Sequence, residues 1–575
     1  MNYKKIKIKV HRKKKTKRIY EPAYNVFDLL DIMKKHGDKI VFSYFDKERN
    51  VIDMTYDYFE NRIKSTCVAF EKLGYRGKKI AIIGETSPLW FCTYFATLAT
   101  GGVCIPLDKE LSPEEIAKFM SWVKCDILAF SPACKQAISQ TCPEHDTIKE
   151  YICLGEDDIC DGEKIRTLSS IIELGSKDAG EYTYNRDIDT TEMQEMLFTS
   201  GTTGTSKCVM LSQKNIFSCA TSAVESVDFN PDDVVVSILP VHHTYELAIN
   251  IAEIIYGIHI CINDSLRHIM KNLQLFKPTG LTLVPLIVET MHQKIWSTAK
   301  RNGSEHKLKL GLMAASTMKK AGIDFRKKLF ANVIDAFGGR LEKIICGGAA
   351  LDPLLISAFE NFGISIYEGY GITECSPLAA VTPYYARKYG SVGPHVPCCD
   401  ARIMGTGIGD FGYLEGEIQI KGDNVMIGYY DNEKANTLAF TEDGWFRTGD
   451  IGYIDDDGYI FITGRLKSVI VLNNGKNVFP EELEEYLGQI KEIKECVVVG
   501  RTDYNENTYI AAVIYPNAEE LPEGLDEEAT IKLFENEIDK VNRKLPIFKR
   551  ITEVELRDTE FEKTTSKKIK RHLVS

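Results

Sequence analysis

The chain has 575 residues, 44% of them hydrophobic and 27% charged, as in an ordinary globular protein. This length is too great for one hydrophobic core, so about two to four domains or subdomains are expected. The 82 acidic residues outnumber the 71 basic ones and give a net charge of −11, which argues against a general nucleic-acid-binding protein, whose surface would be basic.

The first 18 residues form a basic arm with ten Lys or Arg and no acidic residue. Two interpretations remain open for this arm, taken here as residues 1–24. We favour a solvated extension. The alternative is attachment to anionic lipid at the inner face of a membrane, where each basic residue contributes about 1 kcal/mol. No long apolar stretch follows the arm, so no secretory signal peptide is expected.

Sixteen cysteines are scattered along the chain, mostly within apolar runs and without a Cys-x-x-Cys pair. This pattern predicts neither a zinc site nor a redox dithiol. A chain of this size does not need disulfides to stabilise a small core. We therefore expect a reducing, cytoplasmic location.

The stretch from Pro88 to Leu107 carries no charge over a length that would span a bilayer. It also contains three threonines, the pair Gly101-Gly102 and Pro106. These residues favour a buried helix, a glycine turn and a buried strand over a transmembrane helix.

Between residues 25 and 394, helical patterns alternate with short β-type runs. The pattern predicts a helix over Tyr56–Leu73 and strands over Lys79–Ile83, Val234–Leu239, Leu281–Val284 and Lys343–Cys346. Such alternation is typical of parallel sheets covered by helices, the α/β class.

After Pro394, short strands and Gly/Asp turns replace this alternation. Gly407–Gly412 matches G-x-G-x-x-G by its letters, but a strand follows it, so hairpin turns are expected instead of a dinucleotide site. Residues 465–575 have a mixed pattern that predicts a separate small α+β domain. Its expected elements are helices over Pro480–Gly488 and Ala529–Leu545 and strands over Glu495–Val499 and Tyr509–Ile514.

The most informative stretch is Leu197–Ser212, with the sequence LFTSGTTGTSKCVMLS. Apolar residues flank a run of hydroxyl residues and glycines that ends at Lys207, so the pattern predicts strand, loop and strand. Glycines let the backbone approach a ligand, hydroxyls donate hydrogen bonds and lysine adds a positive charge, which together suit a polyphosphate. The P-loop pattern G-x-x-x-x-G-K-[ST] does not fit, because Ser206 precedes Lys207 and Cys208 follows it.

Further motifs follow this loop along the chain: LPVHH at 239–243, CGGAA at 346–350, YEGYGITE at 367–374, WFRTGD at 445–450, GRLK at 464–467, NNGKN at 473–477 and FEKTTSKKIKR at 561–571. In this order they resemble the motifs of the adenylate-forming superfamily, which includes acyl-CoA synthetases, peptide-synthetase adenylation domains and luciferases. The segments HHTYE, GITECSP and SVGPHVP are most similar to those of bacterial long-chain acyl-CoA synthetases.

The resemblance implies the fold and domain organisation of that superfamily. A large N-terminal domain of helix-covered β-sheets plus a distorted β-barrel would span residues 25–464. A small, mobile α+β domain would span residues 465–575 and carry the hinge at Lys467 and the catalytic lysine at Lys568, with Lys567 as the alternative.

The resemblance also implies the nucleotide site. The phosphates of ATP would contact the loop and nearby polar residues, namely Thr199, Ser200, Gly201, Thr202, Thr203, Gly204, Lys207 and Thr373. Adenine would lie against Gly347, Gly348, Ala349, Tyr370 and Gly371, and the ribose against Asp450 and Arg465. Mg²⁺ would bind Glu374 and Thr199, because hard cations shared with phosphates take oxygen ligands.

For the acyl acceptor and the acid, the resemblance places Gly475 in the loop along the pantetheine tunnel of coenzyme A, and His242, His243 and Gly369 at the acyl pocket. We expect the two adjacent histidines to diverge on an extended segment, so they do not suggest a metal site.

The implied reaction activates a long-chain fatty acid with ATP to acyl-AMP and then transfers the acyl group to coenzyme A. Two alternatives remain. The acceptor could be the pantetheine of a carrier protein, or the chain could be a nucleotide-binding homologue without turnover, a reading motivated by Ser206 and Cys208 in the phosphate loop. Lys207 beside Cys208 could favour a thiolate, which raises the hypothesis of oxidation-sensitive activity. A small buried thiol is the interpretation we favour.

Overall fold

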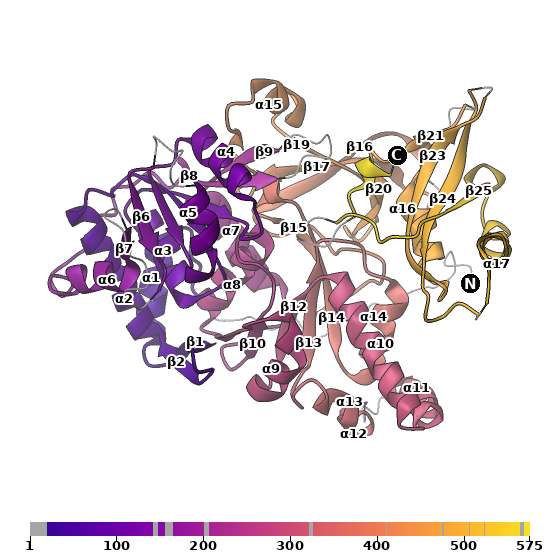
Figure 1. Ribbon diagram of the computed structural model, residues 1–575, viewed down its shortest axis with the longest axis horizontal. Helices are drawn as coiled ribbons and strands as arrows, with labels where there is room; N and C mark the ends of the chain where they lie inside the picture. The colour runs from indigo at the N-terminus through magenta and orange to yellow at the C-terminus, as the bar shows by residue number, and fades with distance from the viewer. Residues whose placement is uncertain are drawn as a thin grey trace. The chain divides into compact units, whose positions relative to one another are not determined.

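The computed structural model describes residues 20–141, 148–155, 165–199, 206–320, 326–409, 411–473, 477–504, 506–522, 524–563 and 569–574. The chain forms two compact units, each with its own sheets (Figure 1). Each unit also has its own hydrophobic core. The first unit takes in residues up to 199, 206–401 and 420–446, and the second takes in 402–419 and the chain from 447 onward.

The first eight-stranded sheet of the first unit is parallel in its interior and has one antiparallel strand at each edge. Its strands, in spatial order, are β15 (Leu378–Val381), β14 (Ser365–Gly371), β13 (Lys343–Gly347), β12 (Gly280–Leu283), β10 (Val234–Ser237), β11 (His259–Ile262), β1 (Ile40–Phe45) and β2 (Val51–Thr55). The carboxyl ends of parallel strands meet at one edge of a sheet, and ligands of open α/β sheets bind at that edge. The segments that follow β10, β12, β13 and β14 therefore share one edge.

The second eight-stranded sheet of this unit ends in an antiparallel hairpin at its β9 side. Its strands are β18 (Gly428–Tyr429), β9 (Lys207–Ser212), β8 (Met193–Thr199), β4 (Val103–Leu107), β3 (Lys79–Ile83), β5 (Ile127–Phe130), β6 (Glu150–Cys153) and β7 (Ile165–Thr167). The strands β8, β4, β3, β5, β6 and β7 run parallel to their neighbours, whereas β9 pairs with β8 and with β18 in antiparallel fashion.

Helices cover both sheets, as the alternating pattern predicted (Figure 1). They are α1 (Val26–His36), α2 (Tyr56–Lys72), α3 (Pro88–Ala99), α4 (Pro113–Val123), α5 (Lys135–Thr141), α6 (Leu168–Ser176), α7 (Gln213–Ser226), α8 (Thr244–Tyr256), α9 (Ile269–Phe276), α10 (Pro285–Arg301), α11 (Glu305–Lys320), α12 (Arg326–Leu329), α13 (Ala331–Asp335), α14 (Pro353–Phe362) and α15 (Glu433–Ala439). Many begin at a side chain that caps the first backbone N–H groups; at α4, Ser112 and Glu115 form a complete capping box.

The uncharged stretch from Pro88 to Leu107 forms a helix, a glycine turn and a strand, so this prediction is confirmed. The helix α3 is buried along its whole length, Gly101 turns the chain with φ +72°, and all of β4 is buried. Among the residues that the structure describes, no helix has both the length and the apolar character to cross a membrane.

Among the described residues of the second unit, the strands form three sheets. A four-stranded sheet, formed by β16 (Cys399–Ile408), β17 (Leu414–Gly422), β19 (Phe446–Ile454) and β20 (Ile460–Arg465), takes the place of the expected distorted barrel. The remaining elements are β21 (Ile470–Val471), β22 (Asn477–Val478), α16 (Pro480–Leu487), β23 (Ile493–Thr502), β24 (Thr508–Pro516), α17 (Glu527–Asn542) and β25 (Glu553–Leu556). The hairpin expected at Gly407–Gly412 joins β16 to β17, and the domain boundary expected at residue 465 stays a prediction.

Candidate functional site

The predicted strand, loop and strand around the phosphate loop are confirmed at both stems. The strands β8 and β9 pair in antiparallel register, with Phe198 opposite Cys208 and Thr199 opposite Lys207. The two predicted ligands Thr199 and Lys207 therefore face each other at the mouth of the hairpin. The predicted loop residues Ser200, Gly201, Thr202, Thr203 and Gly204 lie outside the described residues.

Cys208 is a buried thiol rather than a reactive one. Its side chain packs in the core cluster of the second sheet and is 0% exposed. Burial raises the pKa of the Cys208 thiol to about 12, so the thiolate is disfavoured. Burial therefore argues against the thiolate on which the oxidation hypothesis depends, and the small buried thiol that we favoured agrees with the structure.

A chain of two contacts beside this hairpin links Lys207 to Tyr429 and Tyr429 to Glu374. We call these three residues the contact chain. The ammonium nitrogen of Lys207 lies 4.2 Å from the centroid of the Tyr429 ring, within the range of a cation–π contact. The Tyr429 hydroxyl donates a hydrogen bond to Glu374 Oε1 at 2.8 Å. One tyrosine thus contacts both the predicted phosphate-binding lysine and the predicted Mg²⁺-binding carboxylate.

The backbone fixes the position of Tyr429. The short strand β18 pairs with β9, and Tyr429 lies opposite Val209. Three residues earlier, Met426 N donates to Glu374 O at 2.8 Å. Burial, and then the neighbouring Glu374, raise the pKa of the Tyr429 phenol above its ordinary value, so it remains a hydrogen-bond donor. Sequence reasoning missed Tyr429, whose local signal is only the pair of tyrosines after Gly428.

The small residues predicted to lie against adenine come together at the shared edge of the first sheet. Gly347 on β13 is in register with Gly369 on β14, and the Gly-Gly-Ala and Gly-Tyr-Gly segments follow these positions. A Cβ atom on Gly371 would lie 2.0 Å from Pro377 O, so no side chain fits there. Gly348 has φ +89°, a conformation that favours glycine. Tyr370 itself is buried, at 7% exposure.

Thr373 and Glu374 begin a short 3-10 turn, η5 (Thr373–Cys375), directly after β14. Both side chains are partly exposed. The described residues contain no cluster of three or more His, Cys, Asp or Glu that could hold a metal ion by itself. A single accessible carboxylate fits Mg²⁺ that is shared with a polyphosphate, because Mg²⁺ uses few protein ligands and keeps phosphate and water oxygens.

The two histidines after β10 do not diverge, contrary to the expectation. Their ring centroids lie 4.3 Å apart, because His243 N donates to Pro240 O at 3.1 Å and the segment is a turn rather than an extended strand. His242 Nε2 lies 3.5 Å from Asp108 Oδ2. His243 precedes α8, so both histidines occupy the same sheet edge as the glycine segments.

Glu246 holds this turn in place, which the sequence did not reveal. It is 1% exposed, and the Ser237 hydroxyl donates to Glu246 Oε1. The backbone N–H groups of Ile238 and Leu239 also bond to its carboxyl group. Burial raises the pKa of Glu246 to about 7 in spite of these bonds. The carboxyl group therefore fixes the end of β10 to the first turn of α8.

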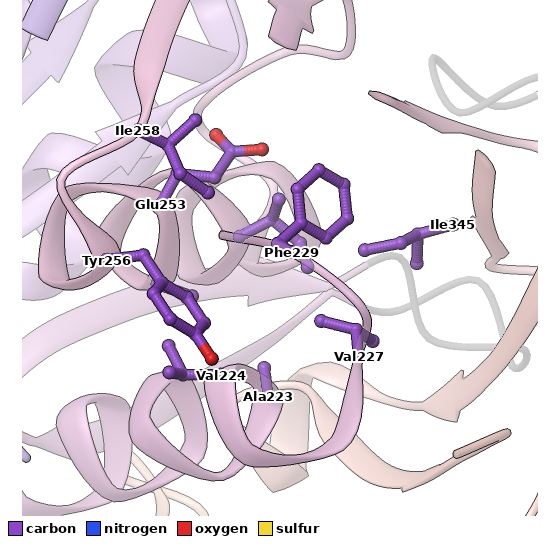
Figure 2. Close-up of a pocket in the computed structure, with 10 residues that line it drawn as sticks. Ala223, Val224, Val227, Phe229, Glu253, Tyr256, Ile258 and Ile345 are labelled. Atoms are coloured by element: carbon purple, nitrogen blue, oxygen red, sulfur yellow. The ribbon is translucent and has the colours of Figure 1, made fainter. Parts of the chain in front are cut away.

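An apolar pocket lies between α7 and α8 (Figure 2). Phe229, Tyr256 and Ile345 supply its larger apolar walls, and Glu253 supplies a carboxyl group. Burial raises the pKa of Glu253 well above its ordinary value, which favours its neutral form. Ile345 stands two residues before Gly347 on β13, so one wall of the pocket belongs to a strand that also carries a predicted adenine-binding glycine.

In the second unit, Asp450 and Arg465 are cross-strand partners on β19 and β20. Arg465 Nε donates to Asp450 Oδ1 at 2.9 Å, and the Asp450 side chain is only 4% exposed. Thr448 supports this part of β19, because its hydroxyl accepts from Asp450 N at 3.0 Å and donates to Ile418 O at 2.7 Å. The two predicted ribose-binding residues are therefore adjacent. The predicted hinge residue Lys467 follows them and is exposed.

Lys568, Lys567 and Gly475 lie outside the described residues, so their predicted roles stay predictions. On either side of the lysines, Lys563 and Ile569 form an antiparallel bridge. Arg571 pairs with Glu484 of α16, which anchors the end of the chain to the core of the second unit. This structural role accounts for the arginine of the C-terminal motif.

Comparison with known proteins agrees with this geometry. Residues 31–430 match the family described as AMP-binding enzyme, and residues 467–575 match the AMP-binding enzyme C-terminal domain. The long-chain-fatty-acid–CoA ligase FadD15 of Mycobacterium bovis is 29% identical over 475 residues, which cover 78% of this chain and 75% of that protein. The long-chain-fatty-acid–[acyl-carrier-protein] ligase AEE15 of Arabidopsis thaliana is 27% identical over 559 residues, which cover 85% and 75%.

Among solved structures, ATP-bound MatB from Rhodopseudomonas palustris has a TM-score of 0.71 and 23% identity, and the alignment covers 95% of this chain and 98% of that one. This likeness confirms the predicted fold class, an α/β large domain followed by a smaller C-terminal domain.

Proposed function

The chain belongs to the AMP-binding enzyme family, and from this premise we propose that it activates long-chain fatty acids and transfers them to coenzyme A. It is an AMP-forming acid–thiol ligase that uses ATP, Mg²⁺ and coenzyme A. The long-chain substrate is the finer part of the proposal, supported by relatives that include a long-chain-fatty-acid–CoA ligase. The observation that carries the proposal is the contact chain of Lys207, Tyr429 and Glu374 beside the phosphate hairpin.

In the first half-reaction, a carboxylate oxygen of the acid attacks the α-phosphorus of ATP, and pyrophosphate leaves. Catalysis is mainly positioning and neutralisation of charge on phosphate oxygens. We assign phosphate contacts to Lys207, Thr199, Thr373 and the loop between the strands, and Mg²⁺ binding to Glu374. When bound, Mg²⁺ supplies positive charge to the phosphate oxygens.

The remaining assignments concern the nucleoside and the second half-reaction. Adenine would lie against Gly347, Gly348, Ala349, Tyr370 and Gly371, and Asp450 with Arg465 would bind the ribose. Lys568 would contact the reacting phosphate, and rotation about Lys467 would then remove it. The thiol of coenzyme A would enter past Gly475 and attack the acyl carbonyl near His243 and Gly369, and AMP would leave.

An alternative acceptor is the pantetheine of a carrier protein, and the similarity to AEE15 supports keeping it. A nucleotide-binding homologue without turnover is less favoured, because the unusual Cys208 side chain is buried in the core and does not project into the phosphate site.

Contact between the basic residues 1–18 and an anionic membrane at the cytoplasmic face is a further part of the proposal. The arm lies outside the described residues, so its composition alone supports it. Flotation of the full chain and of a chain without residues 1–18 with anionic vesicles tests it, and equal partitioning would contradict it.

The test of the main proposal is pyrophosphate release from ATP with carboxylates from acetate to oleate, with and without coenzyme A. Sustained release that peaks with long chains and requires coenzyme A is the expected result. Sustained pyrophosphate release only with a carrier protein would show that the carrier protein, and not coenzyme A, accepts the acyl group. ATP binding without pyrophosphate release for any acid would contradict the proposal.

A further inference from the structure

The helices α10, α11 and α12 carry a charge opposite to that of the whole chain. Residues 294–328, which run from the second half of α10 to α12, contain ten Lys or Arg and two acidic residues, in a chain whose net charge is −11. Lys300 and Arg301 end α10, Lys307 follows in the first turn of α11, and all three are exposed. The helix α11 packs against both α10 and α12 (Figure 1). The basic residues therefore belong to one group of neighbouring helices.

One face of α11 packs on the protein. Leu308, Leu312 and Ala315, spaced by three and four residues, pack in the core cluster of the first sheet. Gly311 lies beside Phe330, whose ring would be 3.2 Å from a Cβ atom on that glycine. These contacts establish which side of α11 faces inward.

The opposite face of α11 is also apolar. Leu310 and Met313, three residues apart, are 52% and 68% exposed, and Ala314 beside them is exposed. Leu329 of α12 extends this surface, because it is 47% exposed and its Cδ2 atom would lie 3.8 Å from a Cβ atom on Gly311. We call Leu310, Met313, Ala314 and Leu329 the outer apolar face. A surface helix normally has polar residues opposite its core-facing stripe, so α11 differs from an ordinary surface helix.

Lysines border the outer apolar face on both sides. At about 3.6 residues per turn, Lys307 and Lys309 fall on opposite sides of the pair Leu310 and Met313. Both lysines are exposed, and Lys309 pairs with Glu305 of the same helix at 2.6 Å. Lysine stems can lie along apolar surface while their ammonium groups reach a polar layer. An apolar face between lysines is typical of helices that lie in the interface of an anionic membrane.

We propose that α11, together with Leu329 of α12, docks on the surface of an anionic lipid bilayer. The outer apolar face enters the boundary between headgroups and acyl chains, and the neighbouring lysines contact lipid phosphates and carboxylates. The helix lies along the bilayer surface and does not cross it. A nucleic acid offers phosphate charge without an apolar layer, whereas a bilayer matches both the lysines and the apolar side chains.

This surface is distinct from the basic residues 1–18, and binding is measured without turnover, so the inference does not rest on the ligase function. The experiment is flotation of the full chain with vesicles of phosphatidylcholine and phosphatidylserine, with pure phosphatidylcholine vesicles as the reference. We expect the chain to float with the anionic vesicles, and less of it to float as salt is added, because salt screens the lysines.

The charge test replaces Lys307 and Lys309 together by glutamine. We expect binding to fall about fivefold for each lysine removed. The matched control is Lys532→Gln with Lys540→Gln on α17, where both lysines are exposed and Lys540 pairs with Glu537 of its own helix. This control should bind as the wild type does.

The apolar test replaces Leu310 and Met313 together by serine. We expect binding to fall by about tenfold or more, because their apolar side chains no longer leave water. The control is Leu438→Ser with Ile547→Ser, at side chains that are 68% and 81% exposed elsewhere. Loss of binding in the lysine variant with full binding in Leu310→Ser with Met313→Ser would show a purely electrostatic contact and overturn the proposal.

A second readout locates the contact in the wild type and needs no variant to fold. The vesicles carry a phospholipid with a photoactivatable group in its acyl chain, and cross-linked peptides are identified by mass spectrometry. We expect cross-links in the peptide that contains Leu310 and Met313. Cross-links confined to residues 1–18 would assign the binding to the basic arm, and they would overturn the proposal, as would a failure of the full chain to float.

Discussion

Replacement of Tyr429 by phenylalanine removes one hydroxyl and leaves the ring beside Lys207 in place. The lost hydrogen bond is the one to Glu374 Oε1 at 2.8 Å. A hydrogen bond to a charged group contributes about 1.5–3 kcal/mol, which corresponds to about a ten- to hundredfold change in an equilibrium constant. Glu374 is partly exposed, so water replaces some of the lost interaction. We therefore expect a change in the equilibrium constant at the lower end of this range, about tenfold.

The assay is a titration of pyrophosphate release with Mg²⁺ at saturating ATP and fatty acid. Partners that orient a ligating carboxylate typically change metal affinity by about 10–100-fold. Tyr429→Phe should therefore raise the Mg²⁺ concentration for half-maximal rate about tenfold, and high Mg²⁺ should restore most of the rate. Tyr430→Phe is the matched control, because the Tyr430 ring lies beside Lys79, with its centroid 5.2 Å from the Lys79 nitrogen. A folded Tyr429→Phe protein with the Mg²⁺ dependence of the wild type would refute the reasoning.

Three further predictions concern the ribose pair, the C-terminal lysine and a buried carboxyl group. Asp450→Asn should raise the KM for ATP about tenfold with a smaller effect on kcat, since the charged acceptor beside Arg465 is lost; an unchanged KM would count against the assignment. Lys568→Ala should block adenylation but spare thioester formation from supplied acyl-AMP, and equal loss of both half-reactions would argue against two conformations. Burial raises the pKa of Glu195 from 4.5 to about 8, so its stabilising contribution is complete below pH 4.5 and is lost as the pH rises to 8. As the pH rises from 4.5 to 8, the unfolding free energy of Glu195→Gln should increase by about 5 kcal/mol relative to that of the wild type in denaturant titrations, and a difference that does not vary with pH would contradict this.

The elements of the fold were predictable where local periodicity and burial agree. The helix expected over Tyr56–Leu73 ends one residue earlier as α2, and the strand over Lys79–Ile83 is β3 without change. Strand ends were less accurate: β10 stops at Ser237, because the following residues bond to the buried Glu246 instead of to a neighbouring strand. Such endings depend on residues that lie later in the chain.

The site was predictable only as a set of motifs, and the contacts between motifs were not. Tyr429 meets Glu374 across 55 residues, and no local pattern joins them. The expected divergence of His242 and His243 failed because it assumed an extended backbone where Pro240 begins a turn. Cys208 follows Lys207 in the sequence, which suggested that its thiol lies near the lysine ammonium group. Successive side chains of a strand point to opposite faces of the sheet, and on β9 this directs the Cys208 side chain into the core.

The most direct test of the central claim follows the oxygen atoms of the fatty acid. The acid is labelled with a heavy oxygen isotope in its carboxylate and incubated with the full chain, ATP, Mg²⁺ and coenzyme A. If the carboxylate attacks the α-phosphorus and the thiol then attacks the acyl carbonyl, one labelled oxygen must appear in AMP. Formation of acyl-CoA with unlabelled AMP, or with ADP and phosphate as products, would contradict the account.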